Sequence, residues 1–406
     1  MSMIKNIASV RGIKCWGAHT GVKSMRRDLA IIYSEVPAAA AAVFTQNKVR
    51  AEPVEISERN VKINNRAQVI ICNAGNANAC TGEQGRLGAE AMVKTTAKML
   101  GIPEEDVIVA STGIIGEPFP TEDVVKGLEE NIPKLSNNTK AGSFVANAIL
   151  TTDTFAKEGF VEFKHDGKTI NMGGIAKGSG MIHPNMATML SFIVTDISID
   201  EKLLDQALRY CVDRTFNMIT VDGDTSTNDM VAIMANGMAE NKKITTESDP
   251  GYIIFREKLL EILTHLAKLI VSDGEGASKF IEYKVSKARS GDVARKLVRA
   301  ISDSTLVKTA MFGRDPNWGR IIAACGNAGV NFNYSKVNLF VGDKEKLVPV
   351  LEKGQPVDFD KNFVKKLLRD SHIRVYLELN TGTESGIGWG TDLTTDYVMF
   401  NSVYTT

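Results

Sequence analysis

Thr188 has the sequence setting that most favours chemistry in this chain. It lies in the stretch AKGSGMIHPNMATML, where a glycine-rich loop meets the apolar run MLSFIV. A threonine hydroxyl becomes a good nucleophile when a base lies beside it, and a cut just before Thr188 would expose the residue's own α-amine as that base. An α-amino group has a pKa of roughly 7.7 to 8.0, so it can accept and return a proton near neutrality. The pattern is therefore consistent with self-cleavage between Ala187 and Thr188.

Two other interpretations of this loop stay open on local grounds. β-branched residues are common in strands, so Thr188 could simply begin one. The glycines around Lys177 also suggest a phosphate-binding loop, although the spacing and the strand-to-helix context of such loops are missing. In that second interpretation the chain is a non-catalytic protein that binds a small molecule and never cuts itself.

The segments around the loop predict a mixed α/β protein. Apolar runs that begin at Leu29, Ala67 and Glu105 have the composition of buried strands, and residues 84–100 and 249–272 have helical spacing. Alternation of this kind predicts an α/β (α+β) layered fold with sheets covered by helices. A length of 406 residues further predicts two substantial domains.

Composition and charge limit the partners. Lys plus Arg and Asp plus Glu both total 48, so no net charge would attract nucleic acid or anionic lipid. The chain begins without an apolar signal-peptide core and has no run long enough to span a bilayer, so we expect a cytoplasmic location and no membrane partner. The five scattered cysteines predict neither zinc nor disulfides. The loop DGDTSTND from Asp222 lacks the downstream acidic residue of a calcium hand, so we expect no metal and assign the loop to the core of the C-terminal half.

Beyond the Thr188 loop, long motifs recur along the chain. They are FTQNKVRAEPV, CNAGNANACTG, STGIIGEPFP, LTTDT, TVDGDTSTND, SDGEGASKF, GRDPNWGR and GTDLTTDYVMFNSVYTT. Together with AKGSGMIHPNMATML they resemble the ornithine acetyltransferase family, the bifunctional glutamate N-acetyltransferases of arginine biosynthesis. The resemblance covers essentially the whole chain.

The resemblance implies a set of site residues. The chain would be cut between Ala187 and Thr188 into fragments 1–187 and 188–406, which stay associated as two copies of each. Thr112 and Gly113 of the STG motif would form the oxyanion hole, where a backbone N–H and a hydroxyl stabilise a tetrahedral intermediate. The substrate-binding residues would be Thr151, Lys177, Thr188, Glu275, Asn401 and Thr406. The sequence leaves open whether Thr151 or Thr152 faces the substrate, although we favour Thr151.

The reaction implied is acetyl transfer from N-acetylornithine to glutamate through an acetyl-threonine ester, with ping-pong kinetics and no bound cofactor. The resemblance leaves open whether acetyl-CoA is a second donor. A self-processing amidase or aminopeptidase with an N-terminal nucleophile would use the same cut and the same threonine, and would differ only in transferring the acyl group to water.

Overall fold

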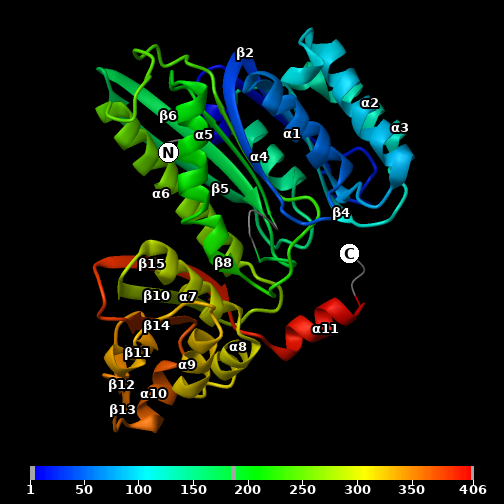
Figure 1. The fold of residues 1–406 in the computed structure, drawn as a ribbon. Coiled ribbons are helices and arrows are strands. Elements are labelled where there is room, and N and C mark those ends of the chain that lie inside the picture. Colours follow the sequence, from blue (N-terminus) through cyan, green and yellow to red (C-terminus); the bar gives the residue numbers. More distant parts are fainter. Residues whose placement is uncertain (1–4, 184–188, 404–406) are drawn as a thin grey trace.

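Two β-sheets organise the chain (Figure 1), and the computed structural model describes residues 5–183 and 189–403. Within those residues the first sheet has eight strands, in the order β4-β3-β2-β9-β7-β6-β5 with β1 beside β2. The second has seven, in the order β13-β12-β11-β14-β10-β15-β8. Each sheet contains parallel and antiparallel pairs, and helices pack on both sheets. The predicted mixed α/β fold class is therefore confirmed.

The bounds of the elements are as follows. The first sheet contains β1 (Ile13–Ala18), β2 (Leu29–Phe44), β3 (Arg66–Asn76), β4 (Val107–Ile114), β5 (Lys157–His165), β6 (Lys168–Lys177), β7 (Leu190–Thr195) and β9 (Met230–Ala235). The second contains β8 (Ile219–Thr220), β10 (Phe280–Ala288), β11 (Asn338–Asp343), β12 (Leu347–Glu352), β13 (Gln355–Pro356), β14 (His372–Glu378) and β15 (Glu384–Thr391). The helices are α1 (Glu52–Asn64), α2 (Gly82–Leu100), α3 (Thr121–Asn131), α4 (Thr139–Ala148), α5 (Glu201–Val212), α6 (Pro250–Ser272), α7 (Gly291–Asp303), α8 (Thr305–Phe312), α9 (Trp318–Gly326), α10 (Lys361–Leu367) and α11 (Thr395–Val403).

The central strands of the first sheet are buried on both faces. In β7, Phe192 and Val194 belong to a core with residues of α4, while Ile193 belongs to another core with α5 and α6. A strand that is covered on both faces has a nearly continuous apolar sequence, as in LSFIV, where Ser191 is the one polar residue.

Local sequence signals set the ends of several elements. Helix α2 ends at Gly101, whose φ of 67° is the left-handed conformation that glycine adopts readily. Helix α6 begins with Pro250, and the carboxylate of Asp249 accepts a hydrogen bond from the Gly251 N–H at 2.7 Å. Strand β2 continues past the predicted apolar run to Phe44, because residues 39–44 pair with β9.

The expected cut lies between two neighbouring strands of the first sheet. Strand β6 ends at Lys177, which pairs with Leu190 at the start of the antiparallel β7. Fragments 1–187 and 188–406 remain predictions. Both would contribute strands to this sheet, so the backbone hydrogen bonds between those strands would hold the two fragments together. Ala187, Thr188 and Thr406 lie outside the described residues. None of the described helices is long and apolar enough to cross a membrane.

Candidate active site

A cavity of about 270 Å³ lies where β4 and β6 end, next to the loops around residues 222–229 and 273–276 and to α11. The sequence-predicted residues among those lining it are Thr112, Gly113, Thr151, Lys177, Glu275 and Asn401. Six residues from distant parts of the sequence are thus brought to one cavity. Met189 and Leu190, which directly follow the expected nucleophile, also line it.

Lys177 forms the cationic side of this cavity. Its side chain is mostly buried, and Nζ donates hydrogen bonds to Thr151 Oγ1 at 2.7 Å and to Thr112 Oγ1 at 3.3 Å. Thr152 lines the cavity as well, but Thr151 supplies the hydroxyl that contacts Lys177. Neutral hydroxyl partners do not compensate the charge of an ammonium group, so the group can also bind an anion such as an amino-acid carboxylate.

Gly113 is required by the backbone. Its φ is +135°, and a Cβ there would lie 2.3 Å from the Gly75 carbonyl carbon on the neighbouring strand β3. Only glycine fits both restrictions. Thr112 contacts the Lys177 side chain, and Thr112, Gly113 and Thr151 line the cavity together with Lys177.

Asn228 is a supporting residue that the sequence analysis missed. Its Nδ2 donates to the carbonyl oxygens of Ala77 at 2.6 Å and Ser111 at 2.9 Å. Ser111 directly precedes Thr112, and its hydroxyl donates to Asn73 Oδ1. The TVDGDTSTND loop therefore also reaches across to β3 and β4, beyond the C-terminal half to which the sequence analysis assigned it. The motif was visible in the sequence, but its partners were not.

Another part of the cavity lining is acidic. Glu275 is buried, and its Oε2 accepts a hydrogen bond from Asn401 Nδ2 of α11 at 3.1 Å. A Cβ on Gly180 would lie 2.2 Å from this carboxylate, so the glycine makes room for it. A Cβ on Gly276 would lie 2.3 Å from the Tyr397 backbone N, so the loop also packs tightly against α11. These contacts hold the C-terminal helix against the site.

Asp222 closes this acidic side from the loop after β8. Its carboxylate accepts the backbone N–H groups of Met181 at 2.6 Å and Ile182 at 2.8 Å, which holds the chain leading toward the expected cut. Burial raises the pKa of Asp222 above its ordinary value, although these hydrogen bonds oppose the shift. Burial and the neighbouring Asp222 together raise the pKa of Tyr397.

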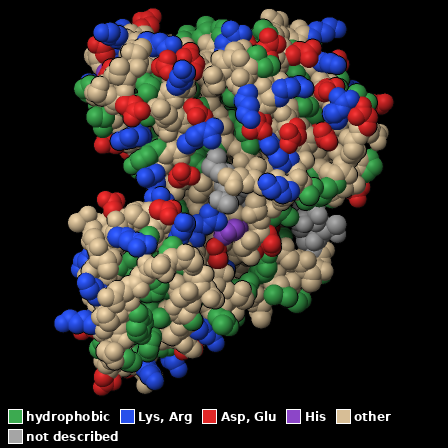
Figure 2. All heavy atoms as spheres, viewed as in Figure 1, with side chains coloured by type: hydrophobic (Ala, Val, Ile, Leu, Met, Phe, Trp, Pro, Cys, Tyr) green, Lys and Arg blue, Asp and Glu red, His purple; other side chains and the backbone are tan. Residues whose placement is uncertain are grey.

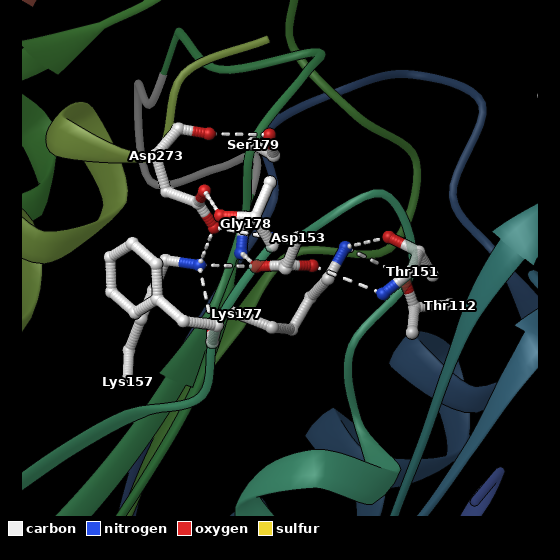
Figure 3. A network of polar contacts seen from close by, with 10 residues as sticks. Thr112, Thr151, Asp153, Lys157, Lys177, Gly178, Ser179 and Asp273 are labelled. Carbon is white, nitrogen blue, oxygen red and sulfur yellow. Dashed lines mark hydrogen bonds and ion pairs between the residues drawn. The ribbon is translucent and has the colours of Figure 1, made fainter. Parts of the chain in front are cut away.

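Behind Lys177 lies a buried charged network (Figure 3). Lys157 Nζ contacts Asp153 Oδ1 and Asp273 Oδ2, each at 2.6 Å, and all three side chains are buried. Burial alone would raise the pKa of Asp153, but Lys177 and Lys157 outweigh it and hold that pKa at about 2. Asp153 and Asp273 occur within the LTTDT and SDGEGAS motifs. Lys157 carried no sequence signal, because an isolated lysine is usually a solvated surface residue.

The polar groups elsewhere on the viewed face are mixed in sign. Figure 2 shows acidic and basic side chains interspersed over it, without a field of one charge.

His183 Nδ1 lies 3.0 Å from Asp303 Oδ1, and Arg299 Nη2 lies 2.8 Å from His183 Nε2. Within residues 5–183 and 189–403, no group of three or more His, Cys, Asp or Glu side chains is arranged to hold a metal ion.

With this geometry in view, comparison with known proteins decides the family. The model of the ArgJ family matches residues 14–406. The chain belongs to the ArgJ family. The arginine biosynthesis bifunctional protein ArgJ of Caldanaerobacter subterraneus subsp. tengcongensis is 47% identical over 396 residues, which cover 98% of this chain and 97% of the relative. The protein of the same name from Thermotoga neapolitana is 48% identical over 400 residues, covering 98% and 99%.

Solved ArgJ-family structures match part of the chain. A crystal structure of the Bacillus halodurans ArgJ protein is 41% identical, with a TM-score of 0.43, and the match covers 46% of this chain and 94% of that one. The Mycobacterium tuberculosis ornithine acetyltransferase, solved in complex with ornithine, is 30% identical with a TM-score of 0.39, covering 46% and 96%. The resemblance inferred from the motifs is confirmed by the family model and the full-length relatives. This ArgJ-family chain is an acetyltransferase of arginine biosynthesis, as that resemblance implied.

Proposed function

We propose that this ArgJ-family chain cuts itself between Ala187 and Thr188 and then carries an acetyl group from N-acetylornithine to glutamate on the Thr188 hydroxyl. One observation supports this most directly. Lys177, Glu275 and Met189, the residue after Thr188, all line a single cavity. A cation and an anion that line one cavity suit an amino acid that carries both charges.

The first step is the cut. The hydroxyl of Thr188 attacks the carbonyl carbon of Ala187, the C–N bond between them breaks, and the acyl group moves to the hydroxyl oxygen as an ester. Water then hydrolyses this ester. The products are a carboxylate on Ala187 and a free α-amine on Thr188, the base that the transfer needs.

The second step is acetyl transfer. The Thr188 hydroxyl attacks the acetyl carbonyl of N-acetylornithine while the α-amine takes the proton. The Thr112 O–H and the Gly113 N–H donate hydrogen bonds to the oxyanion and stabilise it. The amine returns the proton to the departing ornithine nitrogen, which leaves an acetyl ester on Thr188. The amine of glutamate then attacks this ester and forms N-acetylglutamate, and the Thr188 hydroxyl is regenerated.

Recognition follows the charges of the cavity. We assign the substrate α-carboxylate to Lys177 with Thr151, and the side-chain ammonium of ornithine to Glu275 with Asn401. Thr406 completes the proposed substrate-binding set at the end of the chain. Since donor and acceptor share the α-carboxylate and α-nitrogen, they can use the Lys177 side in the same way.

A second donor is proposed from the relatives, whose printed names describe them as bifunctional. In this proposal acetyl-CoA acetylates Thr188 when N-acetylornithine is absent, so the chain also makes N-acetylglutamate from acetyl-CoA and glutamate. The test supplies radiolabelled acetyl-CoA and glutamate alone. Label in N-acetylglutamate supports the second activity, and its absence with an enzyme active on N-acetylornithine contradicts it.

The principal test is denaturing intact-mass spectrometry before and after brief incubation with N-acetylornithine, without glutamate. We expect two fragments that meet at Ala187 and Thr188, with one acetyl group added to the C-terminal fragment. The variant Thr188→Ala should remain one uncut chain without an adduct, whereas Thr188→Ser keeps the hydroxyl and should still be cut. An uncut, unmodified wild-type chain would contradict the proposal.

Two further measurements complete this test. Product analysis with glutamate present distinguishes transfer from the alternative amidase, because an amidase would release acetate instead of N-acetylglutamate. Native mass spectrometry tests the proposed assembly of two copies of each fragment. A dominant species with one copy of each would contradict that assembly.

A further inference from the structure

Lys157 lies at the centre of the buried network behind the cavity (Figure 3). It is the first residue of β5, its side chain is 0% exposed, and its Nζ contacts two carboxylates at 2.6 Å each. A buried ammonium group in water-free surroundings is stable only when such partners compensate its charge. The two carboxylates belong to different segments, Asp153 after α4 and Asp273 after α6.

Asp153 connects Lys157 to the cationic side of the cavity. Its Oδ1 also accepts the N–H of Gly178, the residue after Lys177, at 2.7 Å. Its Oδ2 accepts the N–H of Thr151 at 3.0 Å. One carboxylate thus fixes the backbone beside both residues of the Lys177–Thr151 pair.

Asp273 connects Lys157 to the acidic side. Its carboxylate also accepts hydrogen bonds from the N–H and hydroxyl of Thr154, and its backbone oxygen accepts the Ser179 hydroxyl at 2.5 Å. The Glu275 N–H then donates to the Ser179 backbone oxygen at 3.1 Å. The position of Glu275 relative to Lys177 therefore depends on contacts that meet at Lys157.

The network also affects which groups the Lys177 ammonium group contacts. Among the described residues, no carboxylate lies within 4.0 Å of Lys177 Nζ, whose hydrogen bonds go to Thr151 and Thr112. Asp153 is close enough to interact electrostatically with Lys177, but its Oδ1 already accepts Lys157. Without Lys157, Lys177 would be the cation that interacts most strongly with Asp153.

We propose that Lys157 is a positioning residue for substrate binding: by occupying Asp153 and Asp273 it leaves Lys177 directed into the cavity and fixes the position of Glu275 in the lining of the same cavity. Lys157 itself touches no substrate. The inference rests on the proposed function, because the ligand of Lys177 is there taken to be an amino-acid carboxylate.

The test compares three variants with the wild-type enzyme. Lys157→Met removes the charge and keeps much of the volume. Lys157→Met/Asp273→Asn also neutralises the second carboxylate, which has lost its charged partner, and this should recover stability. Lys279→Met is the matched control, since Lys279 is also buried but donates to the backbone oxygens of Arg369 and Asp370, next to the second sheet.

We expect Lys157→Met to raise the KM for N-acetylornithine and for glutamate about tenfold or more, while kcat changes less than about threefold. In the double variant the melting temperature should recover but KM should stay high, because Lys177 still turns to Asp153. Lys279→Met should lower the melting temperature and leave KM unchanged.

A purely structural role predicts the opposite for the double variant, in which KM would return to the wild-type value together with stability. That outcome, or an unchanged KM in a folded Lys157→Met enzyme, would overturn the inference. Failure of the proposed function looks different, because the wild-type enzyme itself would then not be acetylated by N-acetylornithine.

Discussion

The two sheets are built from similar layers, yet they bury a lysine in different ways. Lys177 of the first sheet contacts two hydroxyls and lines a cavity. Lys308, which packs beside the second sheet, is enclosed and donates to the backbone oxygen of Thr391 at 2.7 Å and to its hydroxyl oxygen at 3.3 Å. Burial lowers the pKa of Lys308 to about 8. The same residue type is therefore available to a ligand in one place and serves packing in the other.

The backbone shows the same contrast. Gly113 in the first sheet and Gly342 in the second both press against other backbone atoms, at 2.3 Å and 1.9 Å from an added Cβ. Only Gly113 combines this contact with a positive φ and a place on the cavity wall. Close backbone packing thus occurs in both sheets, but of these two glycines only Gly113 lies at the candidate site.

The largest expected effect distinguishes these two glycines. Gly113→Ala should lower kcat about a thousandfold, because the added Cβ would displace the backbone N–H that we propose for the oxyanion hole. Both substitutions should lower the melting temperature by similar amounts, but Gly342→Ala should leave kcat unchanged. Steady-state kinetics on the cut enzymes, with melting curves beside them, make the comparison. Equal losses of kcat would show that general instability explains both.

The next effect concerns the cationic side. Lys177→Met should reduce kcat/KM for both substrates about a hundredfold, because the substrate carboxylate loses its partner. Lys308→Met, which removes the enclosed lysine, should leave kcat/KM within about threefold of the wild-type value. If the two variants lost activity equally, the distinction between available and enclosed lysines would fail.

The acidic side should show a smaller, selective effect. Glu275→Gln keeps the shape and an acceptor for Asn401 but removes the charge. We expect the KM for N-acetylornithine to rise about tenfold and the KM for glutamate to change much less, because only ornithine has a side-chain ammonium group. Separate titrations of the two substrates measure this. An equal rise for both would contradict the assignment of Glu275 to the ornithine side chain.

The smallest effect is a pH dependence of stability from the second-sheet lysine. The pKa of Lys308 is about 8 in the folded chain against an ordinary 10.5, so the unfolded chain holds the proton over more of that interval. The free energy of unfolding therefore rises with pH across it. Relative to Lys308→Met, the wild-type protein should gain about 1 kcal/mol from pH 8 to about pH 9. Denaturant titrations at both pH values measure the gain, and a difference that falls with pH would refute it.

Much of the architecture could be predicted from local sequence. The Pro250 start of α6 and the Gly101 end of α2 follow from backbone preferences that act over a few residues. The extension of β2 to Phe44 could not be predicted, because alanine-rich residues gain strand structure only by pairing with β9. The motifs likewise predicted Thr112, Lys177 and Glu275 one at a time, without their distances.

The sequence by itself determined the family, the mixed fold class and the residues expected to do chemistry, since these depend on residue types and short-range spacing. Only the tertiary structure decided that Thr151 contacts Lys177, that Asn401 reaches Glu275 across 126 positions, and that Lys157 contacts Asp273 across 116 positions. The physical reason is that buried charges are stable only with partners, and these partners come from segments that meet only when the sheets and their loops are packed.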